Sequence, residues 1–480
     1  MFETLTFHAL FKLAIGKVNH HDKIVTPATY YNFRKRVVEH KAKTGEDLLE
    51  ACFQQITREQ VLHFNVNGTQ LRMDSKLFGS NIANNTRYDI IAITLQNFLK
   101  LLNNQNRKRL NKIERNLAKE ITKEDVSQTV YVNTSEYIKT RLISIGGLIH
   151  KILTCFKDFE SVNEFSVLKR VFDEQYVIEY TNNDDNNDHQ DNTEKPIEHD
   201  TISITLNKDV PTQSVQSPYD TECTYRNKNN KPVRGYAVNA TETVSDSKED
   251  ISLITDVQVE NASIADKHFL LPAIQRSKKV TNQTPKKLYA DGAFSGEHDP
   301  EQVENIDLVF SGMQGRPGRY KLEQTEKGIL VTDTQTNIVY TARPVKKHKG
   351  KKSQQCSIVN QEGKRVYFSE DAVRAAELRE KLQNRSREEL NKRNNVEATI
   401  FMLGYHLRNG KSKYRGLQKQ KMWVYCRALW INLLRIKKYI GGLPPEVAKQ
   451  LQNSFLLLKY RLFLSIQAIL GLKNQMSYIS

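Results

Sequence analysis

The spacing of apolar side chains divides the chain into helical and strand-like stretches. Residues 1–60 and 86–178 repeat apolar positions at the three- and four-residue spacing of amphipathic helices. Thr26-Pro27 predicts the start of one helix, because threonine caps helices and proline suits their first turn. A short strand is predicted to end at Asp74. Five further strands are expected at 201–206, 233–243, 251–259, 286–290 and 306–310.

The second half of the chain adds two helices and a β-rich stretch. A short helix is expected at about 264–271, stopped by Pro272, and a longer one, broken near its middle, at about 373–407. Residues 318–370 alternate polar and apolar side chains between turns, which predicts a small β insertion. Residues 181–200 are rich in Asn and Asp with one aliphatic side chain, so we expect a disordered loop.

This order of elements predicts an α/β protein with a mixed sheet and two insertions. The expected regions are a helical N-terminal part, 1–66, an α/β part, 67–440, and a C-terminal amphipathic helix, 441–480. The helical insertion, 86–178, follows the first strand, and the β insertion precedes the last long helix. The most apolar run, 455–472, is interrupted by polar residues and is too short to span a bilayer.

Composition points to a polyanionic partner. The 480 residues include 72 Lys and Arg against 55 Asp and Glu, a net charge of +17, which favours nucleic acid or an anionic membrane surface. The five cysteines are far apart without a CxxC pair, which argues against a disulfide framework and a zinc ribbon. No secretory signal is recognisable, so we expect a cytoplasmic protein with reduced thiols.

The strongest charge asymmetry lies near the C-terminus. No Asp or Glu occurs from Ala398 to Pro445, where many cations are interleaved with aromatic residues. A solvated surface normally mixes signs, so this stretch predicts contact with a phosphate backbone. The residues expected to make it are Arg408, Lys411, Lys413 and Arg415. Trp423 and Trp430 are expected in the core rather than at the nucleic acid. A second cationic run, 343–352, fits a DNA contact and a solvated loop equally well.

Three carboxylates are placed where catalytic acids occur. Asp74 and Asp291 each follow a predicted strand, and Glu397 shares a helix face with Arg393 four residues earlier. Taken singly, they fit a turn cap, a turn and a surface salt bridge. Asp220 is an alternative for the first acid, but its flanks predict a loop entering a strand, so Asp74 is preferred.

The ordered segments RMDSKLFGSNIA, ADGAFSG, RNNVEATIFMLGYH and SKYRGL resemble bacterial insertion-sequence transposases of the DDE type. The resemblance runs from about Thr26 to Lys438. It implies a ribonuclease-H-like fold in which Asp74, Asp291 and Glu397 are catalytic and bind two Mg²⁺ or Mn²⁺ ions. Two such ions about 3.5–4 Å apart clamp the attacking and leaving oxygens of a phosphodiester.

The resemblance further implies metal-dependent cleavage and strand transfer of DNA. The expected partners are the terminal inverted repeats of the element, target DNA and at least one further copy of this chain, with no membrane. The N-terminal region would serve DNA binding or assembly in a bacterial cytoplasm. Two alternatives share these features: a ribonuclease-H-like nuclease without strand transfer, and a truncated, inactive DNA-binding remnant.

Two departures from the family pattern are visible. Related transposases often show Tyr, two residues, Arg, three residues, Glu, six residues and Lys. Arg393 and Glu397 fit this spacing, but Leu390 and Gly404 stand at the Tyr and Lys positions. The phosphate-binding role of that Lys would then be either vacant or supplied by another cation, such as Lys411 or Lys413, and Arg393 would contact phosphate. The chain also opens where family members are already well advanced, so a truncated or decayed element is an alternative.

Overall fold

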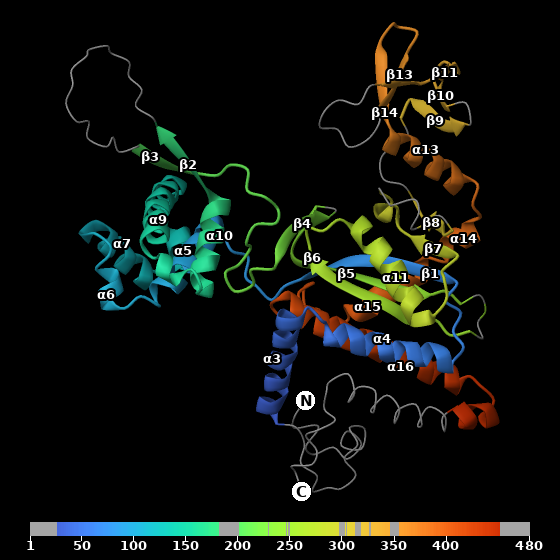
Figure 1. Cartoon of the computed structure of the whole chain (residues 1–480), viewed down its shortest axis with the longest axis horizontal. Helices are drawn as coiled ribbons and strands as arrows, with labels where there is room; N and C mark the ends of the chain where they lie inside the picture. The colour runs from blue at the N-terminus through green and yellow to red at the C-terminus, as the bar shows by residue number, and fades with distance from the viewer. Residues whose placement is uncertain are drawn as a thin grey trace.

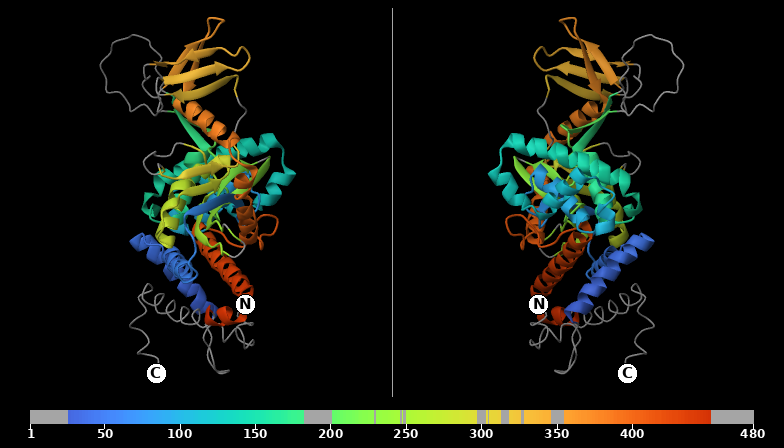
Figure 2. Two further views of the ribbon diagram at one scale, coloured as in Figure 1. Left: turned by 90° about the vertical axis from the view of Figure 1, so that its right-hand side faces the viewer. Right: turned by 90° about the vertical axis from the view of Figure 1, so that its left-hand side faces the viewer.

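The structure, a computed structural model, describes most of the chain. The described residues are 26–181, 201–228, 230–245, 247, 250–296, 303, 305–312, 318–325, 328–345 and 355–451. Figure 1 shows a central mixed sheet with a helical unit on one side. In both side views, small β-sheets stand at one end of the molecule and two helices, α3 and α16, reach toward the other (Figure 2).

The central sheet holds six strands. They are β1 (Gln70–Gly79), β4 (Thr224–Lys228), β5 (Lys231–Thr243), β6 (Ile254–Asn261), β7 (Lys287–Ala290) and β8 (Asp307–Phe310). β5 lies antiparallel between β1 and β6, and β4 pairs with its first residues. β7 lies parallel to β1 on the other side, and β8 is parallel to β7. The predicted mixed α/β organisation is therefore confirmed.

Strand β1 is longer than its sequence indicates. The prediction that it ends at Asp74 is wrong, because the antiparallel pairing with β5 continues to Gly79 opposite Gly235. Gly235 has to be glycine, since a Cβ there would lie 2.1 Å from the carbonyl oxygen of Phe78. This pairing joins distant segments, so local propensity does not reveal it.

Helices cover both faces of the central sheet. One face packs on α15 (Asn394–Leu403) and α16 (Leu417–Gly441), through a core that includes Phe78 and Val238. The other packs on α11 (Leu270–Thr281), through a core that includes Met73 and Leu288. Pro272 does not stop a helix, contrary to prediction, because it lies in the first turn of α11, where no backbone donor is needed.

The helical insertion forms a unit with its own apolar core. Its helices are α5 (Arg87–Leu99), α6 (Asn104–Arg107), α7 (Lys112–Lys123), α8 (Val126–Val132), α9 (Ser135–Cys155) and α10 (Asn163–Gln175). A hairpin of β2 (Tyr176–Thr181) and β3 (Thr201–Leu206) follows, so the helical stretch ends at Gln175, three residues before the predicted 178. The predicted loop at 181–200 lies outside the described residues, apart from Thr181.

The β insertion is present, and the long helix after it is broken twice. The insertion comprises β9 (Tyr320–Thr325), β10 (Gly328–Asp333), β11 (Val339–Thr341), β12 (Arg343–Val345), β13 (Gln355–Val359) and β14 (Arg365–Ser369). The chain then forms α13 (Glu370–Gln383), α14 (Arg387–Asn391) and α15. Most of the cationic run 343–352 and of the predicted C-terminal helix lies outside the described residues.

The N-terminal helices support the sheet from one end. α3 (Pro27–Thr44) begins as predicted, with the Thr26 side chain accepting a hydrogen bond from the backbone of Thr29. α4 (Leu48–His63) packs against α11 and α16. In the part of the chain that the structure describes, no helix has the length and apolar character needed to cross a membrane.

Candidate active site and basic groove

The register of the central sheet brings two of the predicted acids together. β1 pairs in parallel with β7 up to Arg72 opposite Tyr289. If this register is continued by two residues, beyond the last paired positions, Asp74 falls level with Asp291. Asp291 directly follows β7, as predicted, and opens a short 3-10 turn. Asp74 instead lies within β1, at the point where its pairing with β7 ends.

Arg393 joins the first acid to the third. It directly precedes α15, and its Nη2 lies 3.3 Å from Oδ1 of Asp74. Its Nη1 lies 3.3 Å from Oε1 of Glu397, and it also donates to Oγ of Ser311 at 3.2 Å. Nε of Arg393 is buried and has no hydrogen-bond partner among the described residues. The guanidinium therefore holds Asp74 and Glu397 at one place and keeps a spare donor.

The two bridged carboxylates have different surroundings. The side chain of Asp74 is 14% exposed, whereas that of Glu397 is 57% exposed. Burial raises the pKa of Asp74 above its ordinary value, although the charge of Arg393 acts in the opposite direction. The site thus combines a desolvated carboxylate at the sheet with a solvent-facing one on the helix.

A buried ion network holds α15 against the sheet. Oε1 of Glu242 on β5 accepts from Nε of Arg72 at 2.5 Å, and its Oε2 lies 2.8 Å from Nη2 of Arg435 on α16. Thr399 on α15 donates to the same carboxylate at 2.6 Å. Arg72 also reaches the backbone carbonyl of Lys392 at 3.3 Å. Burial acts to raise the pKa of Glu242, but Arg435 and Arg72 outweigh it and hold that pKa below its ordinary value.

The network explains why Arg393 and Glu397 point at Asp74. Thr399 and the Lys392 carbonyl lie on either side of them along the chain, and both are tied to the sheet. Sequence reasoning missed Glu242 and Ser311. One signal was available for the network, because Arg72 and Asp74 are two residues apart on a strand and therefore share a face.

Asp220, the alternative first acid, is buried at another place. Its carboxylate accepts hydrogen bonds from the hydroxyls of Ser80 and Tyr236, the latter at 2.6 Å. Ser80 follows the far end of β1, six residues beyond Asp74. Asp220 thus serves to fix a turn against the sheet, and its oxygens are already engaged.

The four predicted phosphate-binding residues lie in one loop, which closes against the end of β1. The backbone of Gly79 donates to the carbonyl of Gly410 at 2.8 Å. Lys411 donates to the carbonyl of Ile82 at 2.8 Å, and Arg415 to that of Asn81 at 2.6 Å. Both cations therefore fix the loop in place, while Arg408 and Lys413 are exposed.

Lys413 and Arg415 also line a groove between this loop and α3. The groove has a volume of about 650 Å³ and one acidic lining residue, Glu39. We call it the basic groove. Its cationic and aromatic lining residues are Arg34, Lys35, Lys413, Arg415, Lys419, Tyr31 and Tyr414. Arg34 lies 5.5 Å above the ring centre of Tyr414, a cation–π contact that joins α3 to the loop.

The groove and the carboxylates are linked through β1. Asp74 lies five residues before Gly79 on this strand, a distance of about 17 Å. Trp423, partly buried against Phe78, supports the loop from below. Trp430 is 53% exposed, so the expectation that both tryptophans are core residues is wrong for this one. Its position on the outer face of α16 could not be read from its apolar neighbours.

Comparison with known proteins found no match: no family model, no curated protein and no solved structure is similar to this chain. In the ranges described above, no three His, Cys, Asp or Glu side chains are grouped closely enough to hold a metal ion. The chemistry of the donor set nevertheless fits Mg²⁺, which prefers a few carboxylate oxygens. The Arg393 guanidinium now occupies the space between Asp74 and Glu397.

Proposed function

We propose that this protein is a metal-dependent DNA strand-transfer enzyme of the DDE transposase type. The observation that carries the proposal is the convergence of Asp74, Asp291 and Glu397. Asp74 and Asp291 fall level with each other when the β1–β7 register is continued by two residues, and Glu397 is joined to Asp74 through one guanidinium. These residues come from three distant parts of the sequence, and the β1–β7 register and the contacts of Arg393 support the proposal that they form one site.

The topology of the central sheet supports a ribonuclease-H-like catalytic region. β1, β5 and β6 form an antiparallel meander, and β7 and β8 add to β1 in parallel. This order, with a helix between β6 and β7, is the one expected for that fold. The helical insertion extends the connection between β1 and β5, and the β insertion follows β8, so both leave the strand order unchanged.

The three carboxylates would hold Mg²⁺ or Mn²⁺, which supplies an activated oxygen nucleophile and relieves charge on the leaving oxygen. Arg393, with its spare buried Nε, is placed to donate to a phosphate oxygen beside them. The basic groove would hold the DNA backbone on either side of the reacting phosphate. Its aromatic rings offer surfaces on which unpaired bases can stack.

A product assay tests this function. An end-labelled duplex carrying the element ends is incubated with Mg²⁺ or Mn²⁺ and an unlabelled plasmid. We expect both cut DNA and label joined to the plasmid. The matched control is Asp209→Asn, which changes an exposed loop carboxylate outside the site and should leave both products unchanged.

The assay also separates the alternatives. Cut DNA without joined label would identify a nuclease that lacks strand transfer. Binding to the ends with neither product, in every metal tested, would contradict the proposal and identify a DNA-binding remnant.

A further inference from the structure

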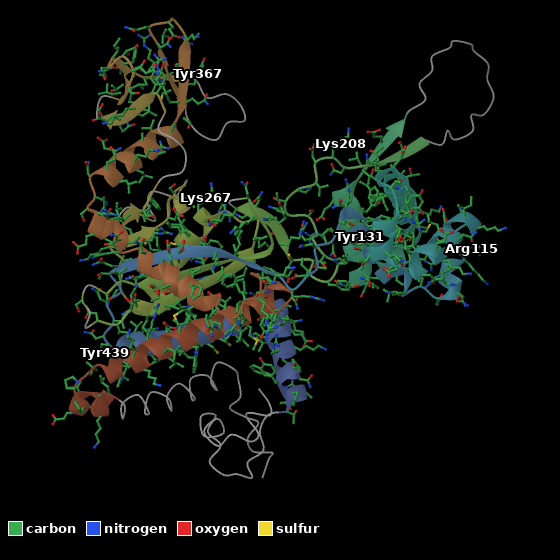
Figure 3. All side chains as sticks on the ribbon, turned by 180° about the vertical axis from the view of Figure 1, so that it is seen from behind. Arg115, Tyr131, Lys208, Lys267, Tyr367 and Tyr439 are labelled. Atoms are coloured by element: carbon green, nitrogen blue, oxygen red, sulfur yellow. The ribbon has the colours of Figure 1, made fainter. Side chains whose placement is uncertain are left out.

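The helical insertion carries a cationic hollow between α6 and α7. It has a volume of about 540 Å³, and none of its lining residues is acidic. We call it the α6–α7 hollow. Its charged lining residues are Arg107, Lys108, Arg115, Lys119 and Lys123. Figure 1 places α6 and α7 at the end of the helical unit away from the central sheet, and Figure 3 shows Arg115 there.

Three of these cations repel one another along α7. Arg115, Lys119 and Lys123 follow at four-residue intervals and therefore share one helix face. Like charges at this spacing destabilise a helix. The two acids of α7 do not relieve this repulsion, since Glu114 caps the helix at Asn111 and Glu120 lies 3.7 Å from Arg141 on α9. The hollow is thus an uncompensated positive surface.

The two arginines of the hollow are held in place by backbone carbonyls. Arg107 donates from Nη2 to the carbonyl of Leu99 at 2.9 Å, and Arg115 from Nε to that of Asn111 at 3.3 Å. Neighbouring Arg109 instead pairs with Asp158 at 2.6 Å, outside the hollow. The three lysines are exposed, with no ion pair to any described residue. Fixed guanidiniums beside adaptable ammonium groups suit a row of phosphates.

We propose that the α6–α7 hollow binds the phosphodiester backbone of duplex DNA, at a segment separate from the one at the carboxylates. The choice of DNA rests on the proposed function, whereas the choice of a polyanion rests on the charges alone. A lipid surface fits less well, because the apolar lining residues, Leu110 and Ala118, are buried and cannot insert into it.

A pair of charge-matched variants tests this site. The first carries Lys108→Gln, Lys119→Gln and Lys123→Gln in the hollow. The control carries Lys139→Gln, Lys151→Gln and Lys157→Gln, three exposed lysines of the same helical unit outside the hollow. Glutamine keeps helix propensity close to that of lysine, and circular dichroism would verify the fold.

Binding of a duplex of unrelated sequence is followed by fluorescence anisotropy over a range of salt concentrations. Each phosphate contact contributes about 0.9 to the slope of log affinity against log salt. We expect the hollow variant to lower this slope by about 2–3 and the control to leave it unchanged. An equal change in both variants would show that net charge alone matters and would overturn the proposal. The proposal would also be overturned if the hollow variant lost its binding to phosphatidylserine vesicles but kept its binding to DNA.

Failure of this proposal is distinguishable from failure of the proposed function. If the full chain cuts and joins DNA but the hollow variant keeps the wild-type slope, only the hollow is refuted. If the slope falls as expected but no variant or wild-type protein yields cut DNA, the hollow stands as a DNA-binding site and the catalytic proposal fails.

Discussion

Two carboxylates on the same face of the central sheet have contrasting surroundings. Glu242 lies opposite Arg72 in the β1–β5 ladder, and Asp74 lies one step along the same face, opposite Ala240. Glu242 is sealed beneath α15 and α16 and bound by two arginines and a threonine. Asp74 has one guanidinium at 3.3 Å and lies where β7 has ended.

The difference shows what makes a carboxylate structural or available. Both carboxylate oxygens of Glu242 are bound by donors of the protein, so the pKa of this group falls although it is buried. Asp74 is desolvated with fewer partners, so its pKa rises, and its unused lone pairs are free to meet a ligand. The position of each residue on the sheet decides whether its carboxylate is structural or available, because Asp and Glu carry the same carboxyl group.

The largest expected effect comes from substituting the three acids of the proposed metal site. Asp74→Asn, Asp291→Asn and Glu397→Gln should each lower metal-dependent DNA cleavage by at least about 10³-fold, because the three act as one unit. For the same reason, the double variants should be no worse than the single ones. Cleavage rates measured with a fixed duplex check this, with anisotropy showing that DNA binding persists. Near-normal cleavage by Asp74→Asn would remove this residue from the site.

Substitution of Glu242 should act differently from substitution of the three acids, because it should lower the stability of the protein and not its activity alone. Glu242→Ala leaves Arg72 and Arg435 without their buried partner and should cost about 3–5 kcal/mol in the free energy of unfolding. Chemical denaturation measures this cost. The control is Glu260→Ala, which removes a half-exposed carboxylate from its ion pair with Lys421 and should cost less than about 1 kcal/mol. Equal costs would contradict the structural role of Glu242.

Local sequence signals predicted the elements but not the pairing between them. The capped start of α3, the strand before Asp291 and the β insertion are encoded by neighbouring residues, and they occur where expected. The extension of β1 to Gly79 depends on its pairing with the distant strand β5, so the predicted end of β1 was wrong. The predicted stop at Pro272 was wrong for a local reason, because this proline lies in the first turn of α11, where no backbone donor is needed.

The sequence suggested the residues of the candidate site but not the contacts between them. Asp74, Asp291 and Glu397 could be chosen from strand ends, a helix face and the family resemblance. That Arg393 bridges two of them, and that Glu242 anchors their helix, depends on a register between distant segments. Lys411 and Arg415 likewise looked like free cations, but they bind backbone carbonyls.

Removing the bridging guanidinium should alter metal affinity. Arg393→Gln takes a positive charge from between Asp74 and Glu397, so Mn²⁺ should bind about tenfold more tightly without DNA. Isothermal titration calorimetry measures this change. Arg387→Gln, at an exposed position on α14, is the control and should leave the affinity unchanged. Weaker Mn²⁺ binding by Arg393→Gln would show that this residue organises the acids instead of competing with the ion.

The smallest expected effect is on folding stability, and it comes from the free-energy cost of keeping Asp74 ionised in the folded protein. Because its pKa is raised in the fold, the folded state binds a proton more readily than the unfolded state, and stability falls as the pH rises through that pKa. Asp74→Asn should therefore stabilise the protein at pH 7 by about 0.5 kcal/mol or less, a gain that disappears in acid. Denaturation at pH 4 and pH 7 measures it. A loss of stability at pH 7 would mean that the ion pair with Arg393 outweighs burial.

The central claim is that Asp74, Asp291 and Glu397 surround one metal site. Iron-directed cleavage of the protein backbone tests it most directly, because Fe²⁺ bound in place of Mg²⁺ generates radicals that cut the chain nearby. The account predicts cuts close to residues 74, 291 and 397 in the wild type, suppressed together by excess Mg²⁺ and in Asp74→Asn. Cuts near Asp220, or cuts that persist in Asp74→Asn, would contradict it.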